Sequence, residues 1–213
     1  MRGIVLALTL VATAVAAQDR ATVQVTTRAA SGSTLTLTLA SGLTITIPAT
    51  DLVYVRDDWP HWLDVDRDCQ DARQEVLIAE SEIQPTLDAA GCRVLAGRWT
   101  DRFSGEIVTD PARAEIDHLV PLAYAFRTGG WAWGPDQRAA FANDLSDPDH
   151  LSVLSASTNR SKGSRGPQAW QPPQRGARCW YARAWLAIAG RWGLTVAPVD
   201  HDALTAMLGH CVN

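Results

Sequence analysis

Threonine and apolar residues alternate along the first part of the chain. The alternation runs through residues 21–27, 34–39 and 43–47, and Ser41-Gly42 separates the last two runs. Neighbouring side chains of a strand point to opposite faces, and a Ser-Gly pair suits a hairpin turn. The pattern therefore predicts a small β subdomain over residues 18–56, with one apolar face and one solvated face of threonine.

The pattern changes in the rest of the chain, where short apolar runs alternate with stretches of helical spacing. Strands are expected at residues 93–99, 106–108, 114–120 and 151–154. Helices are expected at residues 72–81, 122–127, 135–145, 157–162, 180–192 and 202–209. This mixture predicts an α+β domain over residues 57–213.

The first seventeen residues have the composition of a secretory signal peptide. Met1-Arg2 supplies a positive start, residues 3–13 are apolar, and Ala14-Val15-Ala16 offers a small-x-small cleavage site. We expect cleavage after Ala16 or Ala17 and a mature protein that is secreted or periplasmic. An uncleaved N-terminal anchor is the alternative, and no later apolar run is long enough to span a membrane.

Export would allow the four cysteines to form two disulfides. Four cysteines allow three pairings, which the sequence does not separate strictly. Pairing neighbours along the chain favours Cys69 with Cys92 and Cys179 with Cys211. A four-cysteine zinc site is the alternative, but it usually needs a Cys-x-x-Cys spacing that the chain lacks.

Charge is distributed unevenly along the chain, although the net charge is only −4. Residues 51–82 contain ten acidic residues and three arginines, whereas residues 155–192 contain no acidic residue and seven basic ones. A basic segment of this kind suits the phosphate backbone of a nucleic acid. A solvated cationic face is the alternative.

The residue types for metal-assisted hydrolysis follow two of the predicted strands. Asp117 and His118 end the first strand, and Asn159 follows the second. Carboxylate and amide oxygens suit a hard metal ion, and a neutral imidazole accepts a proton from water near pH 7. Neighbours on a strand face opposite ways, so Asp117 and His118 have separate tasks. The alternatives are a structural core histidine and an Asn159 that caps a helix.

These two segments resemble the HNH endonuclease family, whose site is built on a ββα-metal motif. Residues 115–122, Glu-Ile-Asp-His-Leu-Val-Pro-Leu, are similar to the first part of the motif, and residues 159–163, Asn-Arg-Ser-Lys-Gly, to the last part. The motif would span about residues 113–166. A looser likeness to secreted bacterial HNH nucleases extends from about Asp57 to Thr195 and includes residues 68–77, 91–95, 141–145 and 170–173.

The resemblance implies a role for each residue of the two segments. Asp117 and Asn159 would bind the metal, and His118 would activate water. Arg160 and Lys162 would contact the phosphate or the negative charge that develops on it. Further contacts to the nucleic acid would come from Arg165 and Arg178 on the same basic segment.

His150 stands where many HNH proteins have an asparagine that supports the loop between the strands. His150 would either take this loop role, which Asn143 could also fill, or act as a third metal ligand. An oxygen-rich set suits Mg²⁺, the expected ion, or Mn²⁺, whereas ligation by His150 would favour Zn²⁺ or Ni²⁺. The likeness to secreted nucleases also suggests that Arg73 and Glu75 support the site without touching the substrate.

A second metal site is predicted at the start of the first helix beyond residue 57. Asp64, Asp66, Asp68 and Glu75 occupy positions 1, 3, 5 and 12 of a twelve-residue frame, as in an EF-hand loop for calcium. Position 6, where an EF-hand has glycine, is Cys69. The alternative is an acidic helix N-terminus whose charges suit the helix dipole.

Taken with the resemblance, the sequence predicts a monomeric, exported endonuclease that uses one metal ion and acts on DNA, or on RNA as well. The family implies products with a 5′-phosphate. A non-catalytic protein that binds nucleic acid or the cell envelope with an HNH-like fold is the alternative. A metallopeptidase is disfavoured, because the chain contains no His-Glu-x-x-His sequence.

Overall fold

The computed structural model describes residues 25–31, 34–39, 41–48, 52–209 and 211. The chain divides between Val55 and Arg56 into two units, and each is described by itself. The expected signal peptide, residues 1–17, lies outside the described residues. Among the helices that are described, none is both long and apolar enough to cross a membrane.

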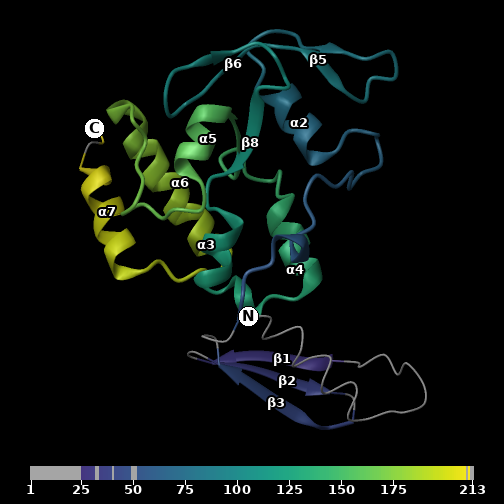
Figure 1. The fold of residues 1–213 in the computed structure, drawn as a ribbon, viewed down its shortest axis with the longest axis vertical. Coiled ribbons are helices and arrows are strands. Elements are labelled where there is room, and N and C mark those ends of the chain that lie inside the picture. Colours follow the sequence, from purple (N-terminus) through teal and green to yellow (C-terminus); the bar gives the residue numbers. More distant parts are fainter. Residues whose placement is uncertain (1–24, 32–33, 40, 49–51, 210, 212–213) are drawn as a thin grey trace. The chain divides into compact units, whose positions relative to one another are not determined.

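The N-terminal unit contains a three-stranded antiparallel sheet in the order β1-β2-β3 (Figure 1). The strands are β1 (Val25–Ser31), β2 (Thr34–Leu39) and β3 (Thr44–Pro48). The register places Thr36 opposite Thr46 and Leu37 opposite Ile45. The register therefore pairs threonine with threonine and an apolar residue with an apolar residue, as the alternating pattern predicts. The first expected strand begins outside the described residues.

The second unit is an α+β fold, as expected. Its helices are η2 (Arg56–Asp58), α2 (Ala72–Ala79), α3 (Leu122–Arg127), η3 (Gly130–Ala132), α4 (Pro135–Ala142), α5 (Ala156–Lys162), η4 (Arg175–Ala177), α6 (Arg178–Arg191) and α7 (Pro198–Leu208). Its strands are β4 (Thr86–Leu87), β5 (Val94–Ala96), β6 (Trp99–Thr100), β7 (Ile107–Val108), β8 (Ala114–His118) and β9 (Leu151–Ser155).

The antiparallel pair β8 and β9 lies at the centre of this unit, with Ala114 opposite Ser155 and His118 opposite Leu151. Both α2 and α5 pack against the pair, and Figure 1 shows β8 between them. Ala114 and Ile116 belong to a buried apolar cluster that includes Val76 and Leu77 of α2. Because side chains alternate along a strand, Glu115 and Asp117 face the other way, towards α5.

The structure breaks the expected strand 93–99 into β5 and β6 at Gly97. A Cβ atom at this position would lie 2.5 Å from the ring of Trp99, so the glycine allows the indole to fold back over the chain. The Nε1 of Trp99 donates to the carbonyl of Leu77, which attaches this strand to α2. The indole is buried in the same apolar cluster as β8.

Both disulfides join the pairs of cysteines that the sequence favours. Cys69 bonds to Cys92 and links the entry of α2 to the turn before β5. Cys179 bonds to Cys211 and links the first turn of α6 to the end of α7. Loops of this length are expected to gain about 3–4 kcal/mol each from closure.

Candidate functional site

Four polar side chains meet between β8 and α5. Glu115 and Asp117 point from β8, and Asn159 and Lys162, three residues apart, line the facing side of the helix. The helix begins at Ser155, whose side chain accepts from the amide of Thr158. Asp101 fixes this start, because its Oδ2 accepts from both the amide (3.1 Å) and the hydroxyl (2.9 Å) of Ser155. Ser155 is thus the N-cap, and Asn159 lies inside the helix.

Lys162 forms a buried ion pair with Asp117. Its Nζ lies 2.8 Å from Oδ2 and 3.0 Å from Oδ1 of Asp117, and 2.9 Å from the carbonyl oxygen of His118. The lysine is 0% exposed. Burial lowers the pKa of Lys162 and raises the pKa of Asp117, and the attraction between the two charges opposes both shifts. The pair joins α5 to the residue expected to act as the base.

Glu115 and Asn159 form the second contact across this face. The Nδ2 of Asn159 donates to Oε2 of Glu115 at 2.6 Å, so the amide oxygen is the end that remains for a cation. Arg160 Nη1 lies 3.9 Å from Oε1 of the same glutamate. Glu115 therefore connects to the site although no role was predicted for it; its position two residues before Asp117, on the same strand face, was the available signal.

His118 lies at the end of β8 and faces away from Asp117. Its ring stacks on those of Trp62 (centroids 5.8 Å apart, planes at 27°) and Phe141 (6.5 Å, 8°). Burial is the main cause that lowers the pKa of His118 well below its usual value, and His150 adds to it. Nε2 lies 2.9 Å from the carbonyl oxygen of Ala142. Because a carbonyl only accepts, Nε2 carries the proton and Nδ1 carries the lone pair.

His150 and Asn143 support the loop between the two strands. Nε2 of His150 donates to the carbonyl of Phe141 at 2.8 Å, and its Nδ1 lies 3.5 Å from Nη2 of Arg191. Burial lowers the pKa of His150 to about 4, so the ring is neutral at pH 7. Asn143 accepts from the amide of Leu63 and donates to the carbonyl of Pro60, each at 2.8 Å. The bonds described for these two side chains thus go to the loop, to Arg191 and to residues 60–63, and none of them goes to Asp117 or Asn159.

Other residues singled out from the sequence bind main-chain atoms. Arg73 Nη2 donates to the carbonyls of Pro111 and Ala114, each at 2.8 Å, and so attaches α2 to the start of β8. Arg178 Nε donates to the carbonyl of Pro172. Arg165 donates to the carbonyls of Ser161 and Lys162 at the end of α5. These arginines hold the framework around the site, whereas Arg160 is 72% exposed.

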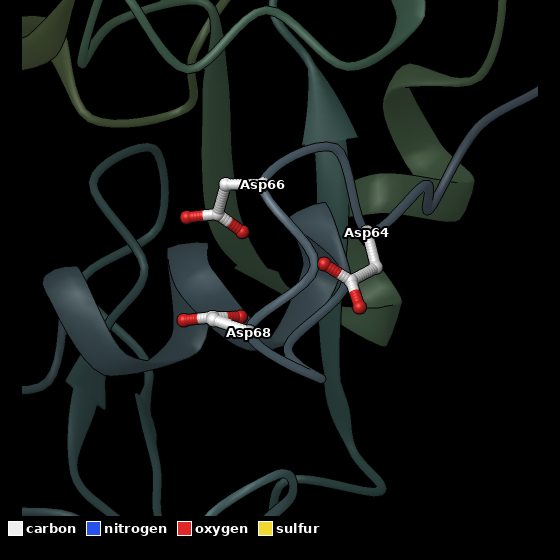
Figure 2. A group of neighbouring side chains, drawn as sticks. All are labelled: Asp64, Asp66 and Asp68. Carbon is white, nitrogen blue, oxygen red and sulfur yellow. The ribbon is translucent and has the colours of Figure 1, made fainter.

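The aspartate loop before α2 lies apart from these residues. Asp64, Asp66 and Asp68 each offer one oxygen within 4.8 Å of the others, and Figure 2 shows the three carboxylates around a turn of the chain. Cys69 has a φ of +77°, the conformation that glycine favours, and its amide donates to Asp64. Burial and these aspartates raise the pKa of Glu75. Calcium binding at this loop stays a prediction.

Comparison with known proteins covers most of the chain. A family model described as the C-terminal domain of GmrSD restriction endonucleases matches residues 70–207. An "Uncharacterized secreted protein" of Arthroderma benhamiae is 34% identical over 173 residues, which is 81% of this chain and 83% of that protein. No solved structure matches the chain. The family match contains β8, β9, α5 and the four side chains that meet between them.

Proposed function

The chain belongs to the family of the C-terminal domain of GmrSD restriction endonucleases, an HNH-type family, and we propose that it is an exported endonuclease that cuts DNA with one divalent metal ion. It therefore contains a nuclease-related domain. The observation that carries the proposal is that β8 holds a neutral His118 at its end, with Asp117 on the other face of the strand towards Asn159 of α5. These are the groups that activated water and a metal ion need.

The donor set fits a hard divalent ion. Asp117 and Glu115 share one face of β8, and the amide oxygen of Asn159 is left for a cation. The ammonium of Lys162 at Asp117 supports this carboxylate as a place for positive charge. Asp117 and Asn159 would hold Mg²⁺ or Mn²⁺, with Glu115 beside them. The bound ion would stabilise charge on the phosphate and on the leaving 3′ oxygen.

Zn²⁺ or Ni²⁺ would be favoured if His150 were a ligand. The ring of His150 instead contacts Phe141 and Arg191, which supports a role in holding the loop. We therefore keep Mg²⁺ as the preferred ion, with Mn²⁺ as its closest substitute.

His118 is proposed to act as the general base. Its lone pair on Nδ1 takes a proton from water as the water oxygen attacks phosphorus and the bond from phosphorus to the 3′ oxygen breaks. The Ala142 carbonyl keeps its bond to Nε2–H before and after this transfer, so the ring does not turn. The resemblance to HNH enzymes implies products with a 5′-phosphate.

The substrate backbone is proposed to lie beside α5. Arg160 and Arg113 are 72% and 74% exposed and line a hollow of about 290 Å³ together with Ser157. Arg160 also lies next to Glu115, so this hollow adjoins the proposed metal position. Two exposed guanidinium groups in a hollow beside the proposed metal position suit the phosphates of a nucleic-acid strand.

Export is proposed on three observations. Residues 1–17 have the composition of a signal peptide, a relative is named a secreted protein, and both disulfides suit an oxidising compartment.

A binding-only protein remains the second candidate, and one observation favours it. Lys162 contacts both oxygens of Asp117, so this carboxylate is engaged before any metal arrives. The two candidates differ in whether phosphodiester bonds are broken.

A nicking assay tests the proposal. Oxidised protein beginning at Gln18 would be incubated with supercoiled plasmid, or with RNA, in Mg²⁺, Mn²⁺, Zn²⁺ or EDTA. We expect cutting in Mg²⁺ and Mn²⁺ and none in EDTA. His201→Ala, an exposed histidine of α7, is the matched control and should cut normally. Absence of cutting with every ion would overturn the nuclease proposal.

A further inference from the structure

Lys162 is the only lysine in the chain. The sequence contains 19 lysines and arginines, and all but this one are arginine. Exposed basic positions are thus all arginine, whereas the single lysine is 0% exposed. An ammonium group is compact and donates in three directions, whereas a guanidinium is a larger planar fork. The buried position beside Asp117 therefore suits a small cation better than a guanidinium group.

The contacts of Lys162 all lie inside the protein. Its ammonium donates to Oδ1 of Asp117 (3.0 Å) and to the carbonyl oxygen of His118 (2.9 Å), and it also lies 2.8 Å from Oδ2 of Asp117. Because the lysine is 0% exposed, its ammonium is not open to a phosphate in this arrangement. The same contacts engage both oxygens of the carboxylate that the proposed function gives to the metal.

We propose that Lys162 is a positioning residue that occupies the cation position of Asp117, and that the metal ion displaces its ammonium from this carboxylate when it binds. The proposal rests on the proposed function. A lysine is needed in the absence of metal because Asp117 would otherwise be a buried carboxylate without a counter-charge. Metal and ammonium then compete, since both carry positive charge to the same two oxygens.

Displacement also gives Lys162 a second position. Its bond to the His118 carbonyl does not involve Asp117, so the ammonium can stay at the end of β8 while its contacts with the carboxylate are released. The ammonium becomes available to a phosphate oxygen only after the metal has bound. The exchange thereby couples metal binding to the phosphate contact expected of Lys162.

A different role predicts the opposite effect on metal affinity. If Lys162 only oriented Asp117 for the metal, with one oxygen for each cation, its removal would weaken metal binding. If Lys162 competes, its removal strengthens metal binding. The sign of the change separates the two roles.

The first experiment needs no substitution at Lys162. Protein made with ¹³C,¹⁵N-lysine gives side-chain signals from one residue only, and Mg²⁺ would be titrated while calorimetry measures binding. Asp66→Asn in the background disrupts the exposed aspartate group as a competing site. We expect the lysine signals to move with the same midpoint as binding. Binding that leaves these signals unmoved overturns the inference alone, whereas absence of any Mg²⁺ or Mn²⁺ binding overturns the metal-dependent function as well.

The second experiment measures metal affinity in Lys162→Met and Lys162→Gln, with Arg183→Gln as a control that removes one exposed charge. We expect at least one of the two Lys162 variants to fold, to bind Mg²⁺ about tenfold more tightly or better, and to melt about 10 °C lower without metal. Added Mg²⁺ should raise its melting temperature more than that of the wild type. Unchanged or weaker Mg²⁺ binding in a folded Lys162 variant overturns the inference.

Discussion

His118 combines a buried neutral ring with a fixed tautomer, and both follow from its neighbours. Its ring stacks on the rings of Trp62 and Phe141, and the Ala142 carbonyl accepts from Nε2. Burial lowers the pKa of His118, so the ring stays unprotonated into acidic solution. His118 can therefore accept a proton at a pH below the usual pKa of an imidazole, as long as the carboxylate that binds the metal is ionised.

The pH dependence of cutting should reflect this low pKa. We expect the rate in Mg²⁺ to hold as the pH falls through 6.5, because His118 remains a proton acceptor there. Initial rates of plasmid nicking between pH 4.5 and pH 8 would measure it. A rate that halves at pH 6.5, as for an exposed imidazole, would contradict the assignment.

Trp62 has a φ of 62°, a conformation that costs a residue with a side chain about 1 kcal/mol or more. Its ring stacks on His118, so we expect the strained backbone to serve the position of the base. Trp62→Gly removes both the strain and the ring. The turnover number should fall about tenfold with a melting temperature within a few degrees of the wild type, while Trp62→Phe should recover most of the rate. A normal rate in Trp62→Gly would exclude this role.

His150 should make the fold sensitive to acid. Burial lowers its pKa to about 4, whereas an unfolded histidine titrates near 6.5. As the pH falls from 6.5 to 4, only the unfolded state gains the proton, so stability is lost over this window, by about 3 kcal/mol at most. Urea unfolding at pH 7.5 and pH 4.5 would show a smaller loss in His150→Asn. That variant should still cut in Mg²⁺, because its loop role does not need a metal-binding nitrogen.

At the scale of elements, the central feature is a helix that starts where β9 ends. Ser155 is both the last residue of β9 and the N-cap of α5, and Asp101 accepts from its amide and hydroxyl. Burial raises the pKa of Asp101, but bonds donated by Thr158, Ser155 and Phe103 outweigh burial and lower it. This buried contact sets the direction in which Asn159 and Lys162 leave the helix.

Asp101→Ala should therefore destabilise the start of α5, the helix that carries Asn159 and Lys162. We expect a loss of about 2–3 kcal/mol in the free energy of unfolding, because the buried Ser155 groups lose a charged acceptor. Urea unfolding would measure it, with the exposed Glu106→Ala as the control, which should change stability by less than about 1 kcal/mol. A loss no larger than that of the control would show that Asp101 does not hold the helix start.

The sequence predicted β8 and β9 because their apolar runs are local signals, and it predicted α5 as the helix of the motif that follows β9. It offered Asn159 as a helix cap, since Asn and Ser are both good caps, and the contact that selects Ser155 comes from a residue 54 positions away. Lys162 was expected to contact a phosphate because of the resemblance to HNH nucleases. Only the pairing of α5 with β8 brings Asp117 to its ammonium, and spacing along one segment cannot show this.

At the scale of the whole molecule, the site depends on segments that are far apart in the chain. Asn143 attaches residues 60–63 to the end of α4, and this segment carries Trp62. Asp200 of α7 accepts from Tyr124 of α3 and from the amide of Gln168, in the segment that follows α5. The pattern of the sequence found the helices but could not show these long-range bonds.

The disulfide Cys179–Cys211 should stabilise the fold without taking part in the reaction. It closes a loop between residues 32 positions apart and ties α7 to α6. Replacing both cysteines with serine should lower the free energy of unfolding by about 2–4 kcal/mol, or the melting temperature by about 10 °C. Cutting at 25 °C should persist, because the proposed site lies on β8 and α5. Loss of cutting by a folded variant would connect the bond to the site.

The most direct test of the central claim is nicking of supercoiled plasmid in Mg²⁺ by the wild type and by His118→Ala. Both proteins would first be compared by thermal unfolding, so that a folding defect is recognised. The account predicts that the wild type cuts and that His118→Ala is at least about a hundredfold slower while it remains folded. Equal cutting by the two proteins would contradict the claim that His118 activates water at this site.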